Sequence, residues 1–131
     1  MAAPLPPHVV VINDDNDLLT VFRELLEGEG YRVSTLSYPT AAASDLMVLA
    51  PDLVVLDMVF GGEDVGWNWL QMMRLDRASV AVPVIVCTAA LHLVRDVQEH
   101  LSGMGISVVP KPFDIDPFLA VVARLAGGAR A

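Results

Sequence analysis

Four polar residues of this 131-residue chain each follow or end a short apolar run: Asp14, Asp57, Thr88 and Lys111. Two carboxylates can hold a divalent cation, and a carboxylate can also attack phosphorus as a nucleophile. The cation offsets the charge repulsion between the attacking carboxylate and a phosphate donor. A hydroxyl and an amine then suit the phosphoryl oxygens, by hydrogen bonding and as a point charge. These residue types predict phosphoryl transfer to Asp57.

The predicted metal site is made mainly of oxygen atoms. Mg²⁺ takes few ligands from a protein and completes an octahedron with water, and Mn²⁺ accepts similar ligands. Asp14 and Asp57 are expected to supply two ligands, and the backbone carbonyl of Val59, just beyond Asp57, a third. The same residue, Asp57, would thus be both metal ligand and phosphoryl acceptor.

Each of these residues taken alone has an ordinary structural explanation. Asp or Asn after a strand often only caps a helix or forms a turn. Thr88 would also suit a cap, and Lys111, which stands between two prolines, would suit an exposed loop. The joint occurrence of all four residue types at the ends of separate apolar runs is much harder to explain in this way and favours a functional site.

The elements that position these residues alternate between short apolar runs and helical segments. Strands are predicted at 9–12, 31–36, 53–56, 84–87 and 106–109, and helices at 18–27, 40–50, 65–76, 91–101 and 114–126. Repeated strand–helix units predict an α/β fold with a parallel sheet covered on both faces. The second and fifth strands alternate apolar and polar residues, as edge strands do, which predicts the order 2-1-3-4-5. In such a sheet the ligand crevice lies beyond the carboxyl ends of the strands.

The composition argues against several classes of protein. Hydrophobic residues make up 54% of the chain and mean hydropathy is +0.54, but no apolar run reaches 18 residues, so no membrane span is predicted. The N-terminus lacks the positive region of a signal peptide, and a single cysteine fits a reducing cytoplasm. The net charge of −8 argues against direct contact with nucleic acid. We expect one cytoplasmic domain at 8–126, flexible ends at 1–7 and 127–131, and no effector domain.

The chain resembles the receiver domain of two-component response regulators over roughly residues 8–126. The matching segments are VVVINDDNDLL, LVVLDM, VIVCTAA and VVPKPF. The resemblance implies a flavodoxin-like, CheY-like fold and phosphorylation of Asp57, with Mg²⁺, by a sensor histidine kinase or a phosphotransfer protein. It also implies that Thr88 is the signalling hydroxyl and Lys111 the phosphate-binding amine. Such a protein is a binding module for a downstream protein of unknown identity, or a homodimer, rather than an enzyme.

The chain departs from the family pattern in three places. The family's acidic pair aligns with Asn13–Asp14, which gives Asp14 the metal role and leaves Asn13 to act through water. A shift of one residue would give Asp15 that role instead. The loop beyond the third strand is longer than usual and contains Gly61–Gly62. Val108 stands where the family has its signalling aromatic residue, so the usual aromatic switch is absent.

Two other functions stay open. A pseudo-receiver would use the same fold as a constitutive interaction domain without phosphorylation, which Asn13 and Val108 favour and the presence of Asp57 argues against. A metal-dependent phosphohydrolase would share the aspartate nucleophile. It would also need an acid/base group near that nucleophile, and Val59, two residues beyond Asp57, cannot act as one.

Overall fold

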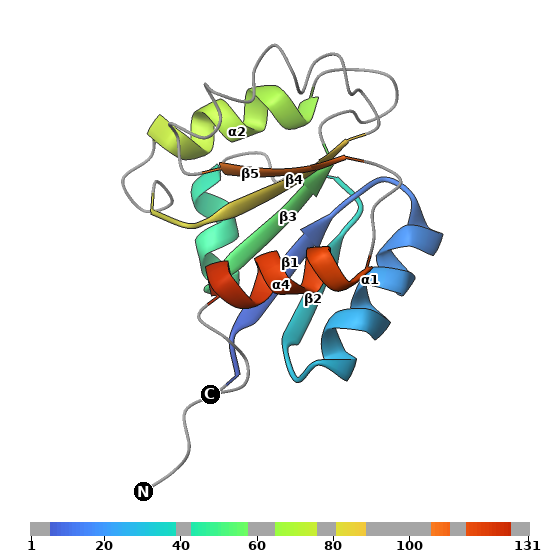
Figure 1. The fold of residues 1–131 in the computed structure, drawn as a ribbon. Helices are drawn as coiled ribbons and strands as arrows, with labels where there is room; N and C mark the ends of the chain where they lie inside the picture. Colours follow the sequence, from blue (N-terminus) through green and yellow to red (C-terminus); the bar gives the residue numbers. More distant parts are fainter. Residues whose placement is uncertain are drawn as a thin grey trace, which may run out of the picture.

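The computed structural model describes residues 6–38, 43–57, 65–75, 81–88, 106–110 and 115–126. Figure 1 shows how these segments are arranged. The strands are β1 (His8–Ile12), β2 (Arg32–Leu36), β3 (Leu53–Asp57), β4 (Val84–Thr88) and β5 (Ile106–Pro110). The helices are α1 (Asn16–Gly28), the 3₁₀ helix η1 (Ala43–Leu49), α2 (Val65–Leu75) and α4 (Ile115–Ala126). The alternation of strands and helices is confirmed in these segments, whereas the helix predicted at 91–101 lies outside the described residues.

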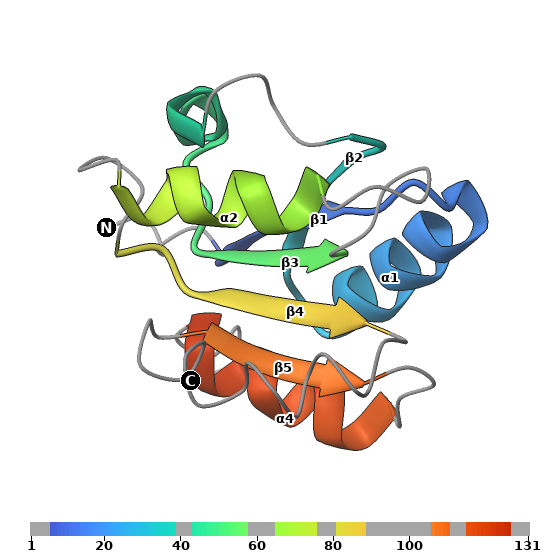
Figure 2. The ribbon, with the colours of Figure 1, turned by 90° about the horizontal axis from the view of Figure 1, so that it is seen from above.

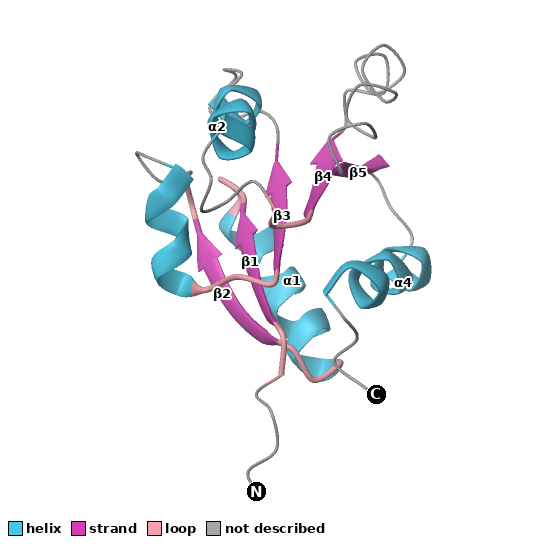
Figure 3. Cartoon of the chain, turned by 90° about the vertical axis from the view of Figure 1, so that its left-hand side faces the viewer, coloured by secondary structure: helices cyan, strands magenta, loops and turns pink. Residues whose placement is uncertain are grey.

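The sheet has five parallel strands in the order β2-β1-β3-β4-β5, which confirms the predicted α/β topology. Figure 3 shows β1, β2, β3 and β4 running in the same direction. The central strands are level with one another, because Ile12 pairs with Leu56 and Asp57 pairs with Cys87. The residues that end these strands therefore lie along one edge of the sheet.

Burial explains why the strands differ in sequence. Every side chain of β1 is buried, whereas those of the edge strand β2 are exposed or only half-buried. A central parallel strand is covered by helices on both faces and needs apolar residues throughout, while an edge strand keeps polar residues on its open side. The difference between the continuous run at 9–12 and the alternating run at 32–36 thus follows from their places in the sheet.

Two apolar cores lie on opposite faces of the sheet. Val10 and Ile12 of β1 belong to the core shared with α2 and η1, and Val9 and Val11 belong to the core shared with α1 and α4. Figure 2 shows α2 and η1 on one side of the strands and α4 on the other. Phe22 of α1 and the α4 residue Phe118 join the second core through a tilted ring contact, with centroids 5.3 Å apart.

The helical segment predicted at 40–50 is described only over 43–49, where it is a 3₁₀ helix rather than an α-helix. The C-terminal end of this segment has a local cause. Pro51 disfavours a right-handed helical conformation for the residue before it. Ala50 instead has a positive φ of 49°, and its N–H donates to Met47 O at 3.0 Å. The helical segment therefore ends at Leu49.

Helix α2 is held by a polar contact as well as by its core. Arg74 near the end of α2 donates from Nη1 to Val82 O at 2.8 Å, which ties the helix to the segment that leads into β4. Burial lowers the pKa of Arg74, but an arginine stays protonated at any ordinary pH.

Among the described residues, no helix has the length and apolar character needed to cross a bilayer.

Candidate functional site

The carboxyl ends of β1, β3 and β4 meet at one edge of the sheet. Asp57 is the last residue of β3, and Thr88 is the last residue of β4. Because Ile12 pairs with Leu56, the residue after β1, Asn13, is level with Asp57 on the neighbouring strand. The backbone therefore brings the predicted acceptor position, the predicted signalling hydroxyl position and the acidic segment after β1 together.

Several predicted site residues fall partly or wholly outside the described part of the chain. The backbones of Asp57, Thr88 and Val108 are described as strand residues, but their side chains are not. Lys111 and Val59 lie outside the described residues altogether, as does the loop that contains Gly61–Gly62. Their predicted roles stay predictions.

Asn13 and Asp15 form the local structure that starts α1. Asn13 is buried, with 2% of its surface exposed, and its Oδ1 accepts the N–H of Asp15 at 2.9 Å. Asp15 is the N-cap of α1, and its Oδ1 accepts the N–H groups of Asp17 at 3.0 Å and Leu18 at 3.2 Å. A cap of this kind satisfies backbone donors that the first turn of a helix leaves unpaired. The ordinary structural explanation therefore holds for Asp15.

Asp14 lies between these two residues and is exposed. The turn made by Asn13 and the cap made by Asp15 place it directly beyond the end of β1, next to the strand that ends in Asp57. Within the described part of the chain, no three His, Cys, Asp or Glu side chains are grouped so as to hold a metal ion. The side chain of Asp57 lies outside the described part, so the pairing of Asp14 with Asp57 stays a prediction.

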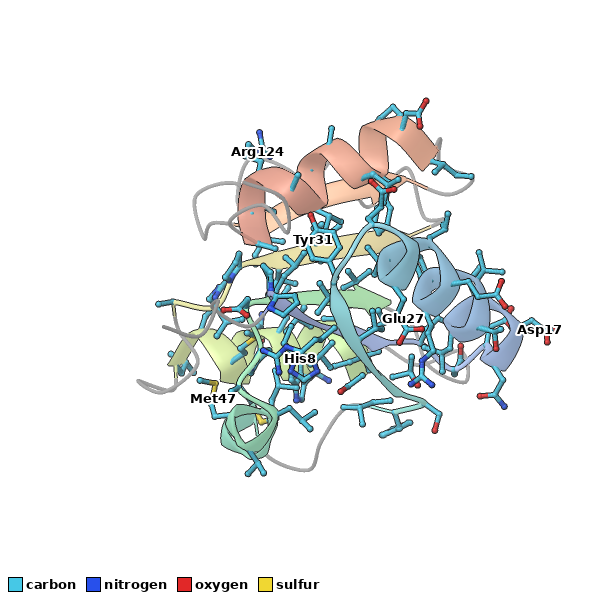
Figure 4. The ribbon with its side chains drawn as sticks, turned by 90° about the horizontal axis from the view of Figure 1, so that it is seen from below. His8, Asp17, Glu27, Tyr31, Met47 and Arg124 are labelled. Atoms are coloured by element: carbon cyan, nitrogen blue, oxygen red, sulfur yellow. The ribbon has the colours of Figure 1, made fainter. Side chains whose placement is uncertain are left out.

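His8 is a polar residue whose importance the sequence did not reveal. It is buried at the start of β1, far from the carboxyl ends of the strands. Its Nδ1 lies 2.7 Å from Leu49 O, and its Nε2 lies 2.7 Å from Ser34 Oγ. Figure 4 shows His8 near Met47 of η1, away from Asp17 in the first turn of α1. These bonds give His8 a role in holding η1 and β2 to β1 rather than in the candidate site.

Comparison with known proteins identifies the family. Residues 9–123 match the family described as response regulator receiver domain. The chain is 32% identical over 119 residues to the DNA-binding response regulator MtrA of Mycobacterium tuberculosis (strain H37Rv), and the match covers 90% of this chain and 50% of MtrA. It spans about half the length of the curated MtrA relatives that it matches.

Two solved structures share the fold. One is the signal receiver domain of a DNA binding response regulator protein (merR) from Colwellia psychrerythraea 34H, with a TM-score of 0.78, 22% identity, and 92% of this chain and 98% of that chain covered. The other is the receiver domain of sensor histidine kinase PA1611 from Pseudomonas aeruginosa PAO1, solved with a magnesium ion in its active site cleft. Its TM-score is 0.70 and its identity 21%, with 94% of this chain and 99% of that chain covered.

The family match covers most of the chain, and the sheet order and the positions of Asp57 and Thr88 at strand ends are those that the sequence predicted. The resemblance stated from the sequence is confirmed, and the chain belongs to the response regulator receiver domain family of two-component systems.

Proposed function

We propose that this domain receives a phosphoryl group on Asp57 from a sensor histidine kinase or a phosphotransfer protein. The observation that carries the proposal is the position of Asp57 at the carboxyl end of the central strand β3, level with the residue that precedes Asp14. Ligands of open α/β sheets bind beyond these strand ends. A carboxylate at this place can attack phosphorus in line with its leaving group, provided that its charge is balanced.

We propose that Mg²⁺ or Mn²⁺ supplies that balance by neutralising charge on the carboxylates and on the incoming phosphate. Asp14, Asp57 and the carbonyl of Val59 would hold the cation. The structure supports Asp14 over Asp15 for this role, because Asp15 already accepts two backbone N–H groups as the cap of α1. The magnesium ion in the receiver domain of PA1611 supports the same choice of metal by family analogy.

The proposed roles of Thr88 and Lys111 follow from the same phosphoryl-transfer chemistry. Thr88 and Lys111 would contact phosphoryl oxygens, the first as a hydrogen-bond donor and the second as a cation. The output would be a change in affinity for a downstream protein, without an aromatic switch, because Val108 occupies that position.

Relatives such as MtrA are described as DNA-binding, so the comparisons do not support the predicted absence of nucleic-acid binding. The net charge of −8 nevertheless favours a protein as the direct partner of these 131 residues.

Intact-mass measurement after incubation with acetyl phosphate and Mg²⁺ tests this proposal. We expect an adduct of one phosphoryl group on the parent chain and none on Asp57→Asn. Asp116→Asn, which changes an exposed aspartate in the first turn of α4, is the matched control and should keep the adduct. No adduct on the parent chain would instead favour a pseudo-receiver, and an adduct that persists in Asp57→Asn would place the acceptor elsewhere.

A further inference from the structure

Asn13 is one of two buried polar residues among the described side chains, and it lies next to Asp57 on the neighbouring strand. An asparagine side chain carries one acceptor oxygen and one NH₂ donor group, which point in different directions from the same planar carbon. The oxygen of Asn13 faces the N–H of Asp15 at 2.9 Å. The NH₂ group therefore points away from the turn that starts α1.

The register of the sheet shows what lies beside Asn13. Positions 13 and 57 follow the paired residues Ile12 and Leu56, so they are level on adjacent strands. Adjacent strands are about 4.8 Å apart, which is within reach of a side-chain amide. The backbone of Asn13 is also anchored, because its N–H donates to Leu36 O at 3.0 Å. The residue is thus held rigidly next to the position of the acceptor.

We propose that Asn13 is a positioning residue that presents a hydrogen-bond donor, rather than an acceptor, to the phosphoryl site. Its oxygen holds the turn that places Asp14, and its NH₂ group donates to an anionic oxygen on the phosphorylated form of the site. The sequence led us to expect that Asn13 would act on the metal through water. A metal-bound water donates its protons and needs an acceptor, which an NH₂ group cannot be. This inference rests on the proposed function of Asp57.

The proposal predicts that Asn13→Asp binds Mg²⁺ more tightly than the parent chain and binds a phosphoryl analogue more weakly. A carboxylate at position 13 can still accept the N–H of Asp15, so the turn is kept while the donor becomes a negative charge. A unit charge about 6 Å from a divalent cation in a water-like medium should tighten Mg²⁺ binding about tenfold. Loss of a donor to a charged oxygen should weaken binding of the phosphoryl analogue beryllofluoride about tenfold, even at saturating Mg²⁺.

Calorimetric titration of the parent chain and of Asn13→Asp, with Mg²⁺ alone and then with beryllofluoride at saturating Mg²⁺, makes the test. Tighter Mg²⁺ binding together with weaker beryllofluoride binding supports the proposal. Equal or tighter beryllofluoride binding by Asn13→Asp would overturn it and restore a water-mediated role for the side chain. The Asn13→Ala variant, which lacks both groups, should bind both ligands more weakly than the parent.

Two controls separate the role of Asn13 from the proposed function of Asp57, on which it rests. Parent protein that binds neither ligand, or Asp57→Asn that binds both as the parent does, would contradict the proposed function rather than the role of Asn13. Urea unfolding of Asn13→Asp without Mg²⁺ should have nearly the parent midpoint, because the bond to Asp15 N–H is kept. Failure of this variant to fold would show that the NH₂ group bonds inside the protein, and would overturn the proposal.

Discussion

The two ends of the sheet use polar residues in opposite ways. At the amino end, the N–H of His8 donates to Asp52 Oδ2 at 2.8 Å, and its ring bonds Leu49 O and Ser34 Oγ. At the carboxyl end, Asn13 and Asp15 accept backbone N–H groups, while Asp14 between them is exposed. Both ends carry Asp and a neighbouring polar residue, so the types of residue alone do not distinguish them.

The difference lies in burial, because the His8 ring is enclosed in the protein whereas Asp14 is exposed. A carbonyl oxygen only accepts, so His8 must donate from Nδ1 to Leu49 O, and its Nε2 can then accept the hydroxyl of Ser34. Both ring nitrogens are used, and a buried, satisfied network of this kind stabilises the fold. An exposed carboxylate at strand ends is instead accessible to a cation. The comparison teaches that burial, more than residue type, separates the scaffold from the candidate site.

The largest expected effect is on stability, from His8→Ala. The change removes both ring bonds and leaves Leu49 O without its donor, so we expect the free energy of unfolding to fall by about 3 kcal/mol. Urea unfolding in Mg²⁺-free buffer measures the loss. Ser34→Ala removes one of the two bonds and should cost about 1 kcal/mol. A loss below that of Ser34→Ala would mean that the amino end is not held by His8.

Asp14→Asn should affect the metal and not the fold. Replacing a direct carboxylate ligand by a neutral amide is expected to weaken Mg²⁺ binding by at least about tenfold, with little change in unfolding. Titration followed by tryptophan fluorescence measures the affinity. The matched control is Asp17→Asn, which changes an exposed aspartate in the first turn of α1. Equal effects in both variants would mean that only general negative charge matters at this end.

Asp15→Ala should affect the stability of the fold more than the affinity for the metal. Loss of the cap of α1 is expected to lower stability by about 1 kcal/mol, while Mg²⁺ affinity changes less than in Asp14→Asn. Thermal unfolding and the same Mg²⁺ titration measure the two quantities. Asp15→Ser keeps a capping oxygen and should recover most of the stability. If Asp15→Ser lost more Mg²⁺ affinity than Asp14→Asn, the metal role would belong to Asp15.

The smallest expected effect is at the end of η1, and its sign is the informative part. Ala50 has a φ of 49°, where a Cβ atom costs roughly 1 kcal/mol that glycine avoids. The greater freedom of glycine in the unfolded chain offsets part of this gain, so Ala50→Gly should stabilise by about 0.5 kcal/mol. Ala120→Gly, at an exposed position inside α4, should destabilise by about 1 kcal/mol. A stability loss in Ala50→Gly would contradict the strain inferred at Ala50.

Much of the fold was predictable because it depends on local patterns. Continuous apolar runs at 9–12 and 53–56 indicated central strands, and the alternating run at 31–36 indicated an edge. The described strands confirm these places in the sheet. The same patterns located Asp57 at the end of a central strand, because a strand that is buried on both faces needs consecutive apolar residues. The 3₁₀ form of η1 was not predicted, because composition does not distinguish a tight helix from an α-helix.

The sequence by itself determined the family, the order of the strands and the position of Asp57 at the end of β3. Only the tertiary structure decided that Asn13 holds the turn, Asp15 caps α1 and Asp14 is exposed, because three adjacent polar residues look alike before the chain folds. The same holds for His8, whose ring bonds Leu49, 41 positions along the chain. Hydrogen bonds between distant segments depend on how the chain folds back on itself, and no local pattern encodes them.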